Sequence, residues 1–283
     1  VQLLRTGNAE GKTQAAGALS NLAVNADNHV TMMRAEAVEP LVQLLRTGDA
    51  AGRTQAARAL SNLAVNAANQ ITIVCAGAVE PLVDLLRTED TEGKTQAAGA
   101  LLKTGDAAVK TQAAGALKNL ALNADNQIAI ARAGAVEPLV ELLRTGDTAG
   151  KTQAARALNS LAGVAANVMA IVRAGAVEPL VELLRTGDAV EKTQAAGAMW
   201  ALACNTENKI MIGRAGAVEP LVQLLMNGDA EGKTQAAGAL MNLADNAVNQ
   251  ITIAHAGAVK PLVQLLSLNA DNQIAICGSA VEL

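Results

Sequence analysis

One motif recurs along the chain and constrains its fold more than any other feature. Six prolines mark the period, because the step between consecutive ones is constant except for one longer step: Pro40, Pro81, Pro138, Pro179, Pro220 and Pro261. A fixed period of about 40 residues, with helical apolar spacing inside each unit, is typical of stacked-helix solenoids. We therefore expect an all-α chain whose core lies between neighbouring units.

Each unit is expected to contain three helices. Asp27 and Asn28 are good N-caps for a short first helix, since their side chains can accept from unpaired backbone N–H groups. Pro40 falls in the first turn of a second helix, where its missing N–H does no harm. Asp49 follows a Thr-Gly pair and is expected to cap a third helix, whose alanines and leucines keep a three- to four-residue spacing.

A glycine follows the first helix in most units, for example Gly77 and Gly134. The position after a helix end favours glycine, because glycine adopts a positive φ without a clash of its Cβ atom. Glu36 occupies this position in one unit and should cost some stability.

Two departures interrupt the pattern. The step from Pro81 to Pro138 is longer than one period, so two third-helix-like segments, 91–102 and 107–122, follow one another and predict a kink or a bulged helix near 88–110. The last unit is incomplete and the chain opens within a second helix, which suggests a fragment of a longer protein. We expect a single array truncated at both ends, with approximate units 1–26, 27–67, 68–123, 124–164, 165–205, 206–246 and 247–283.

Composition excludes several classes of function. The net charge of −4 on mixed signs gives no electrostatic reason to expect nucleic acid or an anionic membrane as a partner. No apolar run approaches the roughly 20 residues of a membrane-spanning helix, so no membrane insertion is expected. Cys75, Cys204 and Cys277 are scattered, which favours a reducing compartment, the cytoplasm or the nucleus. His29 and His255 are far apart in any solenoid, so we expect no metal, no cofactor and no catalysis.

The repeated segments resemble armadillo repeats. Residues 134–143 (GAVEPLVELL) are similar to the second helix of that family, and residues 56–64 (AARALSNLA) to its third helix. The resemblance covers nearly the whole chain. It implies a right-handed superhelix, an α-solenoid, whose third helices line a concave groove that binds extended peptides or disordered tails of partner proteins.

The resemblance also implies a binding pattern, a third-helix Trp followed four residues later by an Asn that fixes the peptide backbone. The Asn is present as Asn21, Asn62, Asn119 and Asn242, and is replaced by Ser160 and Ala201. The Trp is absent in every unit, and its positions hold Gly17, Arg58, Gly115, Arg156, Gly197 and Gly238.

Amide side chains on the third helices are the main candidates for a binding site. The Gln and Asn of one helix are seven residues apart and project from one face. Their amides match the donors and acceptors of a peptide backbone, although they could instead satisfy backbone groups of neighbouring helices. The full set of candidate peptide-binding residues is Gln14, Asn21, Gln55, Arg58, Asn62, Gln112, Asn119, Gln153, Arg156, Ser160, Gln194, Trp200, Gln235 and Asn242.

Three of these candidates allow a second interpretation. Arg58 and Arg156 could pair with acidic side chains of a partner, or could be solvated surface arginines. Trp200 could be an exposed anchor, or its ring could fill space between units. Its position varies freely among units and is therefore expected not to be buried: Ser20, Ser61, Lys118, Asn159, Trp200 and Met241.

The leading hypothesis is a non-catalytic scaffold that binds a segment of a protein or peptide partner. The alternatives are an importin-α-like transport adaptor, the substrate-recruiting arm of a larger ubiquitin ligase, and an engineered repeat protein. Apolar faces without polar capping units at the two ends could also support self-association.

Overall fold

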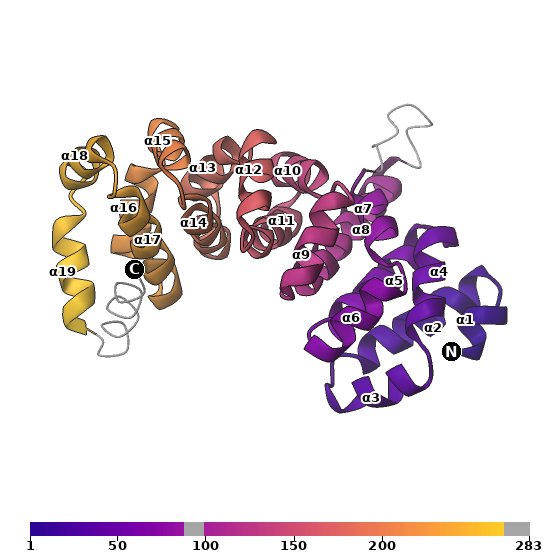
Figure 1. Ribbon diagram of the computed structural model, residues 1–283. Helices are drawn as coiled ribbons and strands as arrows, with labels where there is room; N and C mark the ends of the chain where they lie inside the picture. Colours follow the sequence, from indigo (N-terminus) through magenta and orange to yellow (C-terminus); the bar gives the residue numbers. More distant parts are fainter. Residues whose placement is uncertain (88–98, 269–283) are drawn as a thin grey trace. The chain divides into compact units, whose positions relative to one another are not determined.

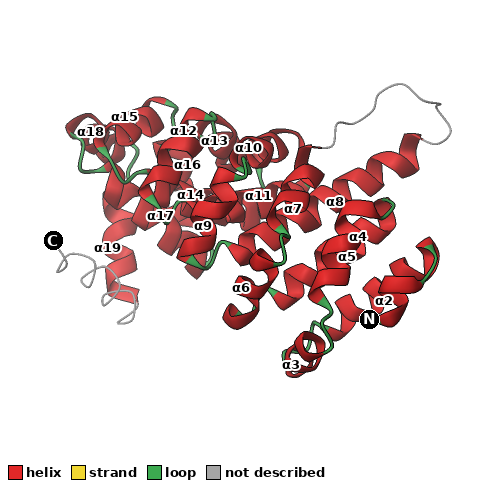
Figure 2. Cartoon of the chain, turned by 45° about the vertical axis from the view of Figure 1, so that its right-hand side comes forward, coloured by secondary structure: helices red, strands yellow, loops and turns green. Residues whose placement is uncertain are grey.

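The structure is a computed structural model that describes residues 1–87 and 99–268, without the side chains of 99–106 and 266–268. Every regular element in these ranges is an α-helix, as Figure 2 shows. The chain divides into two compact units, Val1–Ala174 and Gly175–Leu283, which we call the first and the second unit. Each of them contains several of the three-helix units predicted from the sequence, which we call repeats from here on.

The helices follow the three-helix plan that the period predicts (Figure 1). The first helices of the repeats are α3 (Asp27–Arg34), α6 (Ala67–Cys75), α9 (Ala124–Arg132), α12 (Ala165–Arg173), α15 (Thr206–Arg214) and α18 (Ala247–His255). The second helices are α1 (Gln2–Thr6), α4 (Val38–Thr47), α7 (Val79–Arg87), α10 (Val136–Thr145), α13 (Val177–Thr186), α16 (Val218–Asn227) and α19 (Val259–Leu268). The third helices are α2 (Ala9–Leu22), α5 (Ala50–Leu63), α8 (Gly99–Leu120), α11 (Thr148–Leu161), α14 (Ala189–Leu202) and α17 (Ala230–Leu243).

The core lies between repeats and consists of small aliphatic side chains. In the first unit α2, α5, α8 and α11 pack side by side in that order, and in the second unit α14 packs against α17. Alanines such as Ala56 and Ala59 are fully buried on the third helices, which lets neighbouring backbones approach closely. Leucines of the second helices, such as Leu41 and Leu45, fill the space beneath them and are also buried.

Side-chain caps fix where the helices begin. Asp49 accepts a hydrogen bond from the Gly52 N–H at 2.7 Å and so caps α5, as predicted. The prediction for the first helix is wrong, because Asn25, rather than Asp27 or Asn28, accepts from the backbone there, at 3.0 Å from the Asp27 nitrogen. Other first helices have an asparagine cap at the same repeat position: Asn66, Asn123, Asn205 and Asn246.

A left-handed residue joins each first helix to the second. Glu36 has φ 54°, which is uncommon for a residue with a Cβ atom. At the same position the glycines have φ between 74° and 82°: Gly77, Gly134, Gly175, Gly216 and Gly257. The backbone at Glu36 therefore carries the expected strain. Arg5 partly offsets it, since its guanidinium forms an exposed ion pair with the Glu36 carboxylate at 3.0 Å.

Replacing Glu36 by glycine is expected to stabilise the first unit. Removal of the left-handed strain, about 1–2 kcal/mol, exceeds the loss of an exposed ion pair and the added freedom of the unfolded chain, so the net gain is about 0.5 kcal/mol. Urea denaturation of Glu36→Gly measures it. In an Arg5→Gln background the ion pair is already absent, so Glu36→Gly should raise the free energy of unfolding by more. A loss of stability in that background would contradict the backbone strain at Glu36.

Part of the long step between Pro81 and Pro138 lies in α8. Residues 88–98 lie outside the described residues, but from Gly99 the helix is continuous for 22 residues, whereas α5, for example, has 14 residues. The Thr-Gly-Asp segment at 104–106, which ends a helix elsewhere, lies within α8. On either side the packing continues as in other repeats, because α8 contacts α5 and α11, and α7 contacts α10.

Candidate functional site

Within each unit the third helices present the same repeated surface, which we call the third-helix face. It carries the Gln of each third helix, the residue three positions later and the Asn seven positions later. Contacts between repeats confirm the shared orientation: a Cβ atom on Gly17 would lie 3.6 Å from Gln55 Oε1, and one on Gly115 would lie 3.6 Å from Gln153 Oε1. These glutamines therefore lie beside the glycine of the preceding repeat.

The asparagines of this face bind the preceding repeat. Asn62 Nδ2 donates to the Ser20 carbonyl oxygen at 3.0 Å, and Asn119 Nδ2 donates to that of Ser61 at 2.7 Å. In the second unit Asn242 Nδ2 donates to the Trp200 carbonyl oxygen at 3.1 Å. These bonds correspond to the alternative in which the amides satisfy neighbouring helices. An alanine at Asn62 or Asn119 would therefore remove a contact between repeats as well as any contact with a partner.

The glutamine side chains of this face, unlike the asparagines, form no hydrogen bonds within the described residues. Within the described ranges, their side chains have no hydrogen-bond partner: Gln14, Gln55, Gln112, Gln153, Gln194 and Gln235. Gln14 is exposed and the others are half-buried, while the Gln153 Oε1 atom itself is buried. Asn21, on the first of the third helices, is exposed and Ser160 is half-buried. Apart from the buried Gln153 Oε1, the glutamines thus offer amide groups that no hydrogen bond within the described chain uses.

Positive charge gathers on the third-helix face of the first unit and directly beside it. Arg58 is exposed and Arg156 is half-buried, and neither has an ion-pair partner among the described residues. Lys118, on the helix between them, was not among the binding residues predicted from the sequence. Burial of its ammonium, and secondly the nearby Arg156 guanidinium, lower the pKa of Lys118 below its usual value.

Trp200 packs across the boundary between two repeats. A Cβ atom on Gly238 would lie 2.6 to 2.8 Å from the ring atoms Cδ2, Cε2 and Cε3 of Trp200, so the ring covers this glycine. The indole is half-buried rather than a free anchor. The expectation that this position is never buried is wrong for Ser20, which is fully buried, while the equivalent residues are half-buried or exposed.

The sequence reasoning missed a second set of asparagines, at one position of the first helices. Each donates its Nδ2 to the carbonyl oxygen of the last leucine of the preceding third helix, at 2.8 to 3.1 Å: Asn28, Asn69, Asn126, Asn167, Asn208 and Asn249. Asn167 also donates to the Gln127 carbonyl oxygen at 3.2 Å, and Asn249 to that of Lys209 at 2.9 Å. The available signal was the recurrence of Asn at this position in six repeats.

His29 occupies a structural position. It is buried, and its Nε2 lies 2.8 Å from the Ala23 carbonyl oxygen. Gln70 makes the same bond to Ala64 in the next repeat, at 2.9 Å. Among the described residues no group of three or more His, Cys, Asp or Glu side chains could hold a metal ion.

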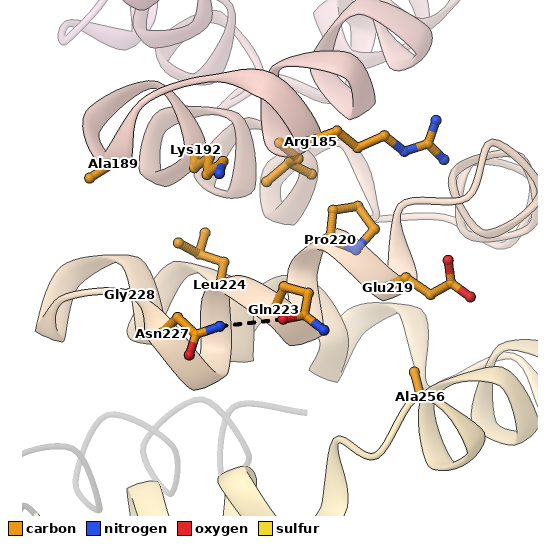
Figure 3. Close-up of a pocket in the computed structure, with 11 residues that line it drawn as sticks. Arg185, Ala189, Lys192, Glu219, Pro220, Gln223, Leu224, Asn227, Gly228 and Ala256 are labelled. Carbon is orange, nitrogen blue, oxygen red and sulfur yellow. Dashed lines mark hydrogen bonds between the residues drawn. The ribbon is translucent and has the colours of Figure 1, made fainter.

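A cleft of about 830 Å³ lies in the second unit, and no residue of the third-helix face lines it. Figure 3 shows the residues that line it. It runs between the end of α13, the start of α14 and α16. Three of its polar side chains are engaged, because Arg185 donates to the Gly216 carbonyl oxygen at 3.3 Å and Asn227 donates to Gln223 Oε1 at 3.3 Å. The two charged side chains that remain, Lys192 on α14 and Glu219 on α16, do not point toward one another in Figure 3.

The repeat contacts agree with a comparison against protein-family models. The armadillo/beta-catenin-like repeat model matches five segments, 25–65, 66–102, 123–163, 165–203 and 205–245. The chain belongs to the armadillo repeat family. Its fold is the α-solenoid that the repeat period predicts.

Solved structures similar to this armadillo repeat protein include engineered ones. An engineered protein is 34% identical and has a TM-score of 0.76, with 87% of this chain and 97% of that chain covered. A designed armadillo repeat protein is 27% identical with a TM-score of 0.74, covering 86% and 97%. A second designed armadillo repeat protein, in complex with the peptide (KR)4, is 27% identical with a TM-score of 0.71, covering 86% and 97%. No curated protein matches the chain.

The described helices include no single candidate for a membrane span. None of them is long and apolar enough by itself to cross a bilayer. One pair, α6 and α7, reaches the required length and apolarity only when both helices are taken together across a 79° bend.

Proposed function

We propose that this armadillo repeat protein is a non-catalytic scaffold that binds an extended segment of a protein partner along the third-helix face. The observation that carries the proposal is the set of glutamine amides that form no hydrogen bond within the described chain, repeated on third helices that pack side by side within each unit. An extended peptide exposes its backbone N–H and C=O groups, and a primary amide can donate to one and accept from the other.

The spacing of the third helices suits such a ligand. Packed helices lie about 8–10 Å apart, and an extended chain advances about 3.3 Å per residue, so one repeat corresponds to about three peptide residues. The designed armadillo neighbour in complex with the peptide (KR)4 supports a peptide as the ligand. We place the protein in the cytoplasm or the nucleus, where disordered segments of partner proteins are accessible.

Selection of peptides from a displayed random library tests the proposal. Selected peptides should lose affinity at least tenfold for the double variant Gln55→Ala/Gln112→Ala, because each lost amide leaves peptide backbone groups poorly paired. Fluorescence anisotropy with labelled peptides measures the change. Neither side chain has a hydrogen-bond partner within the described chain, so helicity and melting temperature should stay close to those of the parent.

The double variant Gln2→Ala/Gln43→Ala is the matched control. It removes two exposed glutamines of the same unit that lie on the second helices α1 and α4. Peptide affinity should be unchanged in this variant. A library that yields no binder, or binders equally weakened by both double variants, would reject the third-helix face as the binding site.

A further inference from the structure

Three cations lie on neighbouring third helices of the first unit. Arg58 on α5 and Arg156 on α11 hold the same repeat position, and on α8 that position is Gly115. Lys118 follows Gly115 by three residues. Ser61 is the residue of α5 equivalent to Lys118, and its side chain contacts the next third helix: Ser61 Oγ would lie 3.5 Å from a Cβ atom on Gly115. Lys118 accordingly lies near Arg156, which acts on its ammonium.

These cations are not balanced by the protein itself. None of the three forms an ion pair within the described part of the chain. The acidic residues of the first unit whose side chains are described lie on first and second helices, in turns or at the starts of third helices. Burial of the Lys118 ammonium beside the Arg156 guanidinium is unfavourable. An anion bound between the two side chains would be attracted by both cations and would reduce the repulsion between them.

The second unit differs at the same repeat positions. Gly197 and Gly238 replace the arginines, and Trp200 and Met241 replace the lysine. The third-helix face of the second unit is thus uncharged at these positions, and the positive charge is specific to the first unit.

We infer that the third-helix face of the first unit selects an acidic extended segment, whose carboxylates pair with Arg58, Lys118 and Arg156. This inference rests on the proposed function and adds the chemistry of the partner. Because one repeat corresponds to about three residues of extended chain, the preferred segment has a carboxylate at about every third residue. A basic peptide such as (KR)4, present in the designed neighbour, is disfavoured here by like charge.

A peptide fits these residues better than a nucleic acid does. Single-stranded nucleic acids are held by aromatic stacking as well as by charge. The chain has no Phe or Tyr, and Trp200 lies in the second unit. The glutamine amides beside the cations match a peptide backbone, and the chain as a whole is negatively charged, at −4.

Binding of three labelled peptides tests the inference. The first has ten residues with a glutamate at every third position, the second has glutamine in place of each glutamate, and the third is (KR)4. At low ionic strength the glutamate peptide should bind at least tenfold more tightly than the glutamine peptide, and (KR)4 most weakly. The advantage of the glutamate peptide should shrink as NaCl is raised.

Two charge-matched double variants locate the effect. Arg58→Gln/Arg156→Gln should weaken the glutamate peptide at least tenfold and leave the glutamine peptide nearly unchanged. Arg34→Gln/Arg132→Gln removes the same net charge from the ends of the first helices α3 and α9, and should change affinity less than threefold. Circular dichroism and melting curves verify that both variants fold as the parent does.

Several results would overturn the inference. Equal affinity for glutamate and glutamine peptides, or equal losses in the two double variants, would remove the acidic preference. Tighter binding of a ten-nucleotide oligothymidine than of the glutamate peptide would assign the cations to nucleic acid. If library-selected peptides depend on Gln55 and Gln112 but are neutral or basic, the acidic preference fails while the proposed function stands. If no peptide binds at all, both fail.

Discussion

Gly238→Ala is expected to destabilise the second unit by about 1–2 kcal/mol and to shift the tryptophan emission to longer wavelength. A methyl group on residue 238 would overlap the ring of Trp200, which must then leave its place over α17. Overpacking of this kind costs about 1–3 kcal/mol, and the better helix propensity of alanine returns about 0.5–1 kcal/mol. Because Trp200 is the only tryptophan, the emission reports on this one contact.

Equivalent glycines of the first unit provide the control for this substitution. At Gly115 a Cβ atom would meet its nearest neighbours at 3.5 Å or more, and at Gly17 at 3.6 Å or more, which is ordinary contact. Gly115→Ala and Gly17→Ala should therefore stabilise the protein by about 0.5–1 kcal/mol. Urea denaturation and fluorescence of the three variants make the comparison.

A second substitution at the ring completes the test. Trp200→Ser introduces serine, the residue type that the equivalent position of α5 holds as Ser61. In the Trp200→Ser background, Gly238→Ala should no longer be destabilising. If Gly238→Ala were as stable as Gly115→Ala, with unchanged emission, the ring would not lie where the structure places it.

Asn167→Ala is expected to cost about 2–3 kcal/mol, more than Asn126→Ala at the same position of the preceding repeat. Both side chains are buried and both donate to the last leucine of a third helix. Asn167 also donates to the Gln127 carbonyl oxygen at 3.2 Å and so joins α12 to α9. A buried group left without its partner costs about 1–3 kcal/mol, so the additional bond should be measurable.

Hydrogen exchange should accompany denaturation in this comparison, because repeat arrays need not unfold in a single step. Asn167→Ala should increase exchange in α9 as well as in α12. Asn126→Ala loses one bond, to Leu120, and should cost about 1–2 kcal/mol. Equal losses in the two variants would mean that the bond between first helices contributes nothing.

The repeat period and local rules were sufficient for much of the fold. The constant step between prolines predicted the solenoid, and Asp49 and Pro40 marked helix starts correctly because caps and first-turn prolines depend on residues close in sequence. Glu36 was recognised as an exception for the same reason, since the shape of one turn decides it. Rules that depend on residues close in sequence thus predict a single helix and the residues at its ends.

Contacts between repeats required coordinates. Asn28 is a good cap by its chemistry, but its actual partner is the Leu22 carbonyl oxygen of the preceding helix. The environment of Trp200 depends on the missing Cβ of Gly238 in another repeat, and that of Lys118 on Arg156. An amide or a ring has several suitable partners by chemistry alone, and the stacking of helices selects among them.

The continuous α8 also bears on how such a gene can change its length. Helices on both sides of α8 keep their neighbours although the chain between Pro81 and Pro138 is longer than one period. Misaligned recombination between tandem copies therefore need not add or remove whole units to leave a foldable product. In this chain a third helix lengthened at its start keeps its contacts with both neighbouring third helices, so the length of such an array can change in steps smaller than one repeat.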